Sequence, residues 1–186
     1  MLLLGCTPPG RHIEQHDVFF GIANSLQELI PEIEAFWPEP DKIHIDAWRE
    51  VTAVDGYAVK ILPKDNTIED HKQKLFFINL GGYLENRFEE QHYMLLTVKE
   101  DRSAAFKQAK ETLFFKHNHF TGANSHIDDK YGIDVDDLYE IADILSPSQK
   151  QQYQIELIPG AKLKEDSINL GYLKLSRLAQ GIITTE

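Results

Sequence analysis

The sequence contains a single cysteine, few basic residues and no long apolar run. One cysteine, Cys6, excludes a disulfide within the chain and a zinc site built from several cysteines. The apolar runs fall short of the roughly 20 residues that a transmembrane helix needs. With 19 Lys and Arg against 30 Asp and Glu, the net charge is −11, whereas nucleic acids and anionic membranes bind clustered basic side chains. We therefore expect neither a nucleic-acid nor a membrane partner.

The residues that are present are sufficient for a folded core. The chain has 186 residues, of which 42% are apolar, and it includes 10 Phe and 7 Tyr. This composition argues against disorder. No basic segment followed by an apolar stretch precedes Arg11, so no export signal is indicated and the cytoplasm is the expected location.

The chain repeats itself. Residues 4–16 and 80–92 align without a gap at an offset of 76, and six of the 13 positions are identical. The identical positions are Leu4/Leu80, Gly5/Gly81, Arg11/Arg87, Glu14/Glu90, Gln15/Gln91 and His16/His92. Two further blocks recur in the same order, His44-Ile45-Asp46 as His126-Ile127-Asp128 and residues 57–63 as 153–159. Blocks that keep their order indicate an internal duplication.

The repeat divides the chain into four parts. Copy one covers 1–63, a polar linker covers 64–74, copy two covers 75–159, and a C-terminal extension covers 160–186. Copy two is longer, and its segment 135–145 (VDDLYEIADIL) predicts an inserted short helix. Within the extension, residues 168–175 predict one more strand.

Each copy predicts the order β-β-α-β-β. Alternating apolar and polar residues predict strands at 43–48 and 57–62, and apolar runs predict strands at 16–22, 75–78 and 92–98. Helical spacing predicts a helix over 26–36, and a composition rich in Ala, Lys and Glu predicts one over 103–115. A copy of about 60 residues buries too little apolar surface alone. We therefore expect an α+β protein in which two β-β-α-β-β repeats, with mainly antiparallel sheets, pack about a pseudo-two-fold axis. The aromatic residues expected in or near the shared core are Phe19, Phe20, Trp37, Trp48, Phe76 and Phe77.

Polar residues recur in pairs with a spacing of two. The pairs are Glu14 with His16 and His44 with Asp46 in copy one, and Glu90 with His92 and His126 with Asp128 in copy two. Residues i and i+2 of a strand point to the same face, so each pair projects a carboxylate beside an imidazole. Just upstream, Arg11 and Arg87 could clamp an anion or neutralise the glutamates.

Several interpretations of these pairs stay open. They could form structural hydrogen-bond networks, line a pocket for a small polar or anionic ligand, hold a metal, or act in catalysis. The absence of a known catalytic motif favours a non-enzymatic binding or interaction module with structural networks, and we expect no metal or cofactor. The alternative is a hydrolase or metal-assisted enzyme that uses the pairs of one copy. An assembly protein that pairs exposed strand edges would instead be a homo-oligomer.

Two weaker candidates lie outside the paired positions. His117 and His119, with His126 and Asp128, could hold zinc, but copy one has no counterpart of the first two histidines, which favours solvated loop residues. Cys6 could act as a thiolate nucleophile. Copy two has Gly82 at that position, which favours a small buried apolar side chain instead.

The motifs resemble a known bacterial family. LGCTPPGRHIEQHDVFFGI at 4–22 and HIDAWREVTAVDGYAV at 44–59 are similar to the family called "domain of unknown function 1543". The resemblance covers about 1–63, and more loosely 75–159. It implies a soluble bacterial protein with two tandem copies, and it implies no activity, cofactor or catalytic residue.

Overall fold

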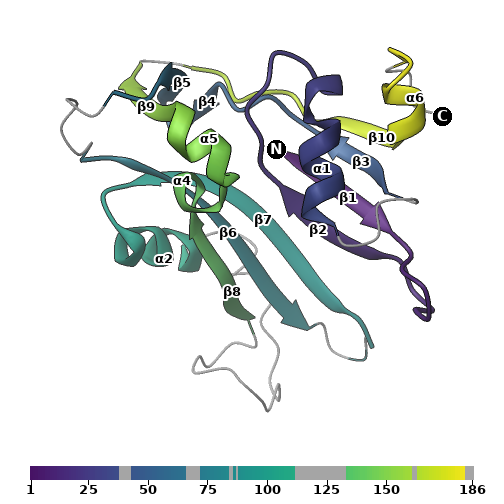
Figure 1. The fold of residues 1–186 in the computed structure, drawn as a ribbon. Helices are drawn as coiled ribbons and strands as arrows, with labels where there is room; N and C mark the ends of the chain where they lie inside the picture. The colour runs from purple at the N-terminus through teal and green to yellow at the C-terminus, as the bar shows by residue number, and fades with distance from the viewer. Residues whose placement is uncertain are drawn as a thin grey trace.

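A computed structural model describes residues 1–37, 43–65, 72–83, 86, 88–111, 133–160 and 163–182. Its strands form three sheets in which every pair is antiparallel, and short helices pack beside them (Figure 1). The expected α+β class is confirmed. None of the described helices is long and apolar enough to cross a membrane.

The first sheet has the strand order β10-β3-β1-β2. Its strands are β1 (Leu2–Cys6), β2 (Gln15–Phe19), β3 (His44–Trp48) and β10 (Asn169–Lys174). The 3-10 helix η1 (Gln27–Leu29) leads into α1 (Ile30–Phe36), where Pro31 occupies the first turn and costs no helical hydrogen bond. One apolar core joins this sheet to α1 and to α6 (Leu175–Leu178), and alternate β1 residues contribute to it.

The second sheet has the order β7-β6-β8. Its strands are β6 (Lys74–Tyr83), β7 (Glu90–Lys99) and β8 (Ile133–Glu140). Helix α2 (Arg102–Lys110) begins after Asp101, whose side chain accepts a hydrogen bond from the Ala104 amide. Small residues of α2, Ala105 and Ala109, pack directly on buried β6 side chains.

The third sheet joins strands from both halves of the chain, in the order β4-β5-β9. Its strands are β4 (Ala53–Val54), β5 (Tyr57–Pro63) and β9 (Tyr153–Pro159). Asp55 and Gly56 have φ angles of 50° and 78°, as the predicted tight hairpin turn requires. Before β9 stand α4 (Ile141–Ile144) and α5 (Pro147–Gln152), and the Ser146 side chain caps α5.

A shared apolar core lies between the sheets. Phe20 of the first half and Phe77 of the second meet edge to face, with ring centroids 5.4 Å apart. The other expected aromatic residues are in separate cores, because Phe19, Trp37 and Trp48 pack in the core of the first sheet and Phe76 lies in the core beneath α2. The shared core therefore involves two of the six aromatic residues that the sequence indicated.

The prediction of an inserted helix over residues 135–145 is wrong. Most of that segment is β8, which pairs along β6 from Ile133 to Glu140, and only Ile141–Ile144 forms a helical turn. Val135 and Leu138 pack against the core beneath α2. Pairing with the buried strand β6 therefore overrides the helix-like spacing of the apolar residues.

Two of the sheets contain the same local pattern. The order β3-β1-β2 in the first corresponds to β8-β6-β7 in the second. The pairing of β1 with β3 changes register between Leu3 and Leu4. The pairing of β6 with β8 changes register between Asn79 and Leu80, 76 positions later in the chain. In the ladder between β5 and β9, Lys60 stands opposite Glu156, Tyr57 opposite Pro159, and Pro63 opposite Tyr153. Exchanging the two segments that recur in the sequence, 57–63 and 153–159, therefore leaves the register unchanged.

Candidate functional site

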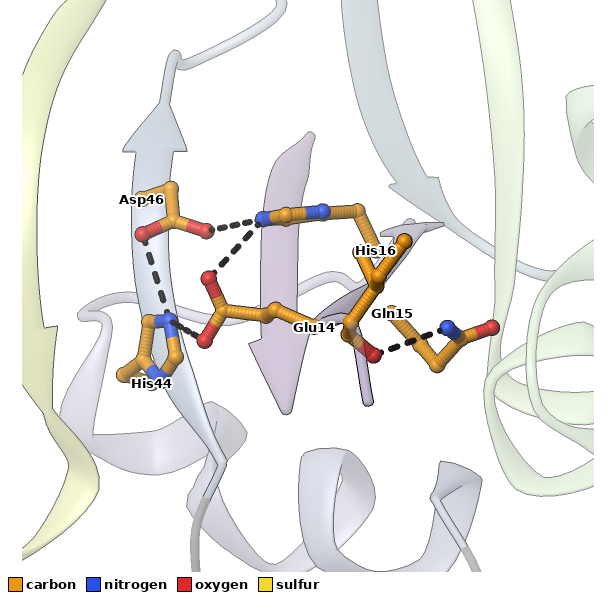
Figure 2. A network of polar contacts seen from close by, with 6 residues as sticks. Glu14, Gln15, His16, His44 and Asp46 are labelled. Atoms are coloured by element: carbon orange, nitrogen blue, oxygen red, sulfur yellow. Dashed lines mark hydrogen bonds and ion pairs between the residues drawn. The ribbon is translucent and has the colours of Figure 1, made fainter. Parts of the chain in front are cut away.

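Four side chains of the first sheet form a closed set of contacts, called the quartet here: Glu14, His16, His44 and Asp46 (Figure 2). His16 Nε2 lies 3.2 Å from Asp46 Oδ2 and 3.5 Å from Glu14 Oε2. His44 Nε2 lies 3.3 Å from Glu14 Oε1 and 3.3 Å from Asp46 Oδ1. Each imidazole therefore contacts both carboxylates, and each carboxylate contacts both imidazoles.

The sheet brings the two predicted pairs together over Gly5. In the ladders, Gly5 of the central strand β1 stands opposite His16 on β2 and opposite His44 on β3. Neighbouring strands are about 4.8 Å apart, so side chains from β2 and β3 must reach across β1 to meet. A Cβ at residue 5 would lie 2.4 Å from His44 Nε2 and 2.6 Å from Asp46 Oδ2. The missing side chain of Gly5 is what leaves room for the quartet.

The quartet is buried on one side and open on the other. His44 is only 3% exposed, and its ring lies against the Tyr172 ring of β10, with centroids 4.2 Å apart. The side chains of His16 and Glu14 are 43% and 40% exposed, and that of Asp46 is 26% exposed. Solvent therefore reaches both carboxylates and one imidazole, while the other imidazole is held in place by packing.

The quartet has no basic side chain to balance its carboxylates within the described residues. Arg11 is exposed and makes no ion pair with Glu14. Instead, it borders a small surface pocket beside Gln15, His16 and Trp37. The role suggested by the sequence for Arg11, neutralising Glu14, is therefore not supported by the contacts.

The second sheet carries a related but different polar cluster. Its His92 Nε2 lies 3.7 Å from Glu90 Oε2, and its Nδ1 lies 3.3 Å from the amide nitrogen of Asn79. The same Asn79 nitrogen donates to Asp137, which also accepts a hydrogen bond from the Tyr139 hydroxyl. This hydrogen bond to Asp137 raises the pKa of Tyr139 above its usual value of 10, and the negative charge of Asp137 acts in the same direction.

Strand register shows which residues of the two halves correspond. Gly81 stands opposite His92 and opposite Asp134, as Gly5 stands opposite His16 and His44. The strand position of His44 is therefore taken by Asp134 in the second half. The sequence alignment matched His44 with His126, which lies outside the described residues.

A cleft of about 960 Å³ lies between the two sheets. One histidine from each half lines it, His16 from β2 and His92 from β7. Asn79, Asp137 and Tyr139 of the second cluster also line it. Both polar clusters therefore contribute side chains to the lining of the same cleft, although they belong to different sheets.

Several sequence candidates lie elsewhere. Five of them fall outside the described residues: Arg87, His117, His119, His126 and Asp128. Cys6 is buried in the core of the first sheet, as expected for a small apolar side chain. In the described part of the chain, no group of three or more His, Cys, Asp or Glu side chains is arranged so that it could hold a metal ion.

Sequence reasoning missed several residues at these clusters. Tyr172 lies in the extension outside both copies, so the repeat could not point to it. Asn79 aligns with Leu3, and Asp137 lies in the segment that the alignment left without a counterpart, so a search for identical positions passes over both. Gly5 was part of the repeated Leu-Gly motif, and that recurrence was the available signal.

Comparisons with known proteins support the resemblance and the fold. Residues 11–61 match the family model described as Domain of Unknown Function (DUF1543), which covers one copy in the first half. The crystal structure of the protein Il1583 from Idiomarina loihiensis is similar over 94% of each chain, with a TM-score of 0.59 and 20% sequence identity. Likeness at this identity concerns the fold alone. A search of curated proteins gave no match.

Proposed function

We propose that the protein is a non-enzymatic binding module that takes a small polar ligand into the cleft between its two sheets. The observation that carries this proposal is the pairing of His16 and His92, which occupy corresponding strand positions and line one cleft. Each imidazole contacts a carboxylate of its own sheet, at 3.5 Å from Glu14 and 3.7 Å from Glu90. Such contacts orient an imidazole toward a ligand.

The exposure of the quartet supports a ligand-binding role over a purely structural one. A purely structural network would be sealed from solvent, because buried polar groups find their partners within the protein. Here His16 and Glu14 are about two-fifths exposed, and His16 faces the cleft. These side chains can exchange a contact within the quartet for a contact with a ligand.

The charge of the cleft favours a cation over the anion that the sequence left open. The anionic alternative depended on Arg11 and Arg87, and Arg11 does not line the cleft. Among the described residues that line it there is no Lys or Arg, whereas Asp17, Glu32 and Asp137 all contribute carboxylates. An acidic cleft concentrates small cations and repels anions. The proposed ligand is therefore a small organic cation with hydrogen-bonding groups.

We further infer that the site arose with a duplication of the chain, with copies at 1–63 and 75–159 related by a pseudo-two-fold axis. Three observations support this: the matching strand orders, the shifts in register 76 positions apart, and the register of β5 with β9, which is unchanged when the two strands are exchanged. The linker 64–74 then joins the copies, and the extension 160–186 contributes β10 to the first sheet.

The test is a ligand titration of the full chain, monitored by two-dimensional NMR. Guanidinium and ethylenediamine serve as cationic probes, and acetate and phosphate as anionic ones. We expect saturable shifts with a cation, weakened in both His16→Gln and His92→Gln. His12→Gln is the matched control, since His12 is exposed and does not line the cleft. Binding of anions in place of cations would refute the charge argument, and equal binding by all three variants would refute the site.

A further inference from the structure

We propose that the cation taken by the cleft is a linear diamine, held by one ammonium group at Glu32 and by the other at Asn79 and Asp137. This inference rests on the proposed function, because it names the class of cation that the same cleft binds. It depends on two places in the cleft lining, called the anchors here, where a buried acceptor atom has no hydrogen-bond donor among the described residues. Apolar side chains separate the anchors, so two amines joined by a methylene chain match the lining.

The first anchor is the Glu32 side chain of α1. Its Oε1 accepts a hydrogen bond of 3.3 Å from the Ser146 hydroxyl at the start of α5, and both residues line the cleft. Its Oε2 is buried, and no donor in the described ranges reaches it. A buried acceptor without a donor is costly, and hydrogen bonds to charged groups are the stronger ones. A small rotation of this side chain would bring Oε2 to an ammonium group in the cleft.

The second anchor lies on the other sheet, at Asn79 of β6 and Asp137 of β8. The Asn79 amide nitrogen donates to Asp137 at 3.4 Å, and the Asn79 Oδ1 atom is buried with no donor in the part of the chain that the structure describes. Negative charge gathers here from both sheets. The hydrogen bond to Asp137 is the main cause of the raised pKa of Tyr139, and the charge of Asp17 adds to it, whereas Arg102, which does not line the cleft, has a smaller opposite effect. This anchor therefore favours a positively charged donor.

An apolar stretch of the lining separates the two anchors. Phe77 lies two residues before Asn79 on β6, so both side chains point to one face of the strand and are about 7 Å apart along it. Phe77 packs with Leu145 in the shared core, and both line the cleft. Ser146, the partner of Glu32, follows Leu145 in the chain. A methylene chain can lie along this apolar surface, whereas a compact cation such as guanidinium is too short to reach both anchors.

The chemistry and the size of the cleft agree with this class of ligand. The unpaired buried atoms of Glu32 and Asn79 are both acceptors, so a ligand that offers only acceptors, such as a carboxylate, would leave both unpaired. An ammonium group has three donors and no acceptor, as these atoms require. The cleft volume of about 960 Å³ is large for a compact ion and lies within the range of sites that hold whole organic molecules.

The experiment is a calorimetric titration of the full chain with linear diamines and with monoamines of the same chain length, putrescine against butylamine and cadaverine against pentylamine. We expect at least one diamine to bind more tightly than its monoamine by about ten-fold or more, because it adds a second hydrogen bond between charged groups. Glu32→Gln and Asp137→Asn each remove one charge while keeping the shape, and each should bring that ratio of affinities close to one. Glu34→Gln is the matched control on α1 and should keep the ratio, since Glu34 is exposed and does not line the cleft.

Three results would overturn this inference and leave a cation site in the cleft intact. One is equal affinity of the wild type for both diamines and their monoamines. A second is a ratio of affinities that Glu32→Gln and Asp137→Asn leave unchanged, and a third is an equal fall of the ratio in Glu34→Gln. Failure of every amine and of guanidinium to bind would refute the proposed function, and this inference with it. Circular dichroism shows whether each variant is folded, and if Glu32→Gln unfolds, Asp137→Asn tests the second anchor alone.

Discussion

Replacing Gly5 by alanine tests the geometry of the quartet most directly. The added Cβ would lie 2.4 Å from His44 Nε2 and 2.6 Å from Asp46 Oδ2, well inside van der Waals contact. His44 cannot move away easily, because it is buried and packed on Tyr172. Asp46 is partly exposed and can rotate. The cost of Gly5→Ala should therefore come mainly from His44.

The magnitude follows from two opposing effects. Overpacking of a buried site costs about 1–3 kcal/mol in the free energy of unfolding. Alanine in place of glycine inside a strand contributes about 0.5–1 kcal/mol in the other direction. Gly5→Ala should therefore destabilise the wild type by up to about 2.5 kcal/mol. In a His44→Ala background the main clash is absent, so the same substitution should be neutral or stabilising. The coupling energy between the two positions should be about 1–3 kcal/mol.

The assay is urea unfolding of the wild type, both single variants and the double variant, followed by tryptophan fluorescence. Trp37 and Trp48 both pack against the core of the first sheet, so the signal reports on that part of the protein. Comparable slopes with urea concentration are needed for the free energies to be compared. If Gly5→Ala costs the same with and without the His44 imidazole, the close approach over β1 is not the reason for glycine at this position.

Two further predictions concern the shared core and the second cluster. Phe77→Ala removes one ring of the aromatic pair between the sheets and should lower the free energy of unfolding by about 3–5 kcal/mol. Fluorescence and circular dichroism should report the same single unfolding transition. Two separate transitions would contradict a core shared by both halves. Asp137→Asn should lower the pKa of Tyr139 toward 10, as measured by absorbance at alkaline pH, because the charge of Asp137 and the hydrogen bond to it favour the protonated hydroxyl. The stabilisation from the protonated hydroxyl is complete below pH 10 and is lost as the pH rises through the pKa of folded Tyr139, so the wild type should lose more stability there than Asp137→Asn.

Local patterns in the sequence were sufficient to predict much of the fold. Alternation of polar and apolar residues located β3 and β5, apolar runs located β2 and β7, and the Asp55-Gly56 pair located the hairpin turn. The spacing of two within each pair also indicated that Glu14 and His16 share a face, and the two side chains contact each other. These features depend on neighbours within a few residues, which a sequence displays directly.

The parts that failed depend on contacts between distant segments. The segment 135–145 has apolar residues at helical spacing, and only its pairing with β6 makes it a strand. The meeting of the two polar pairs likewise requires β2 and β3 to flank β1, an order that periodicity does not encode. Tyr172 reaches His44 because β10 pairs with β3 across more than 120 residues of chain. Long-range pairing decides each of these cases.

The strand ladders give a comparison of the two sheets that does not depend on the alignment of identical residues. Matching identical letters placed His126 against His44, an offset of 82, whereas the ladders place Asp134 there, an offset of 90. The block at 126–128 lies outside the described residues, whereas the ladders show that the central glycines and the shifts in register coincide. By register, the second half retains the Glu and His of β7 but has an aspartate where the first half has its buried imidazole. At these matching points of the ladders the two sheets each place a histidine opposite the central glycine, and they differ on the other side of it, where His44 stands in one sheet and Asp134 in the other.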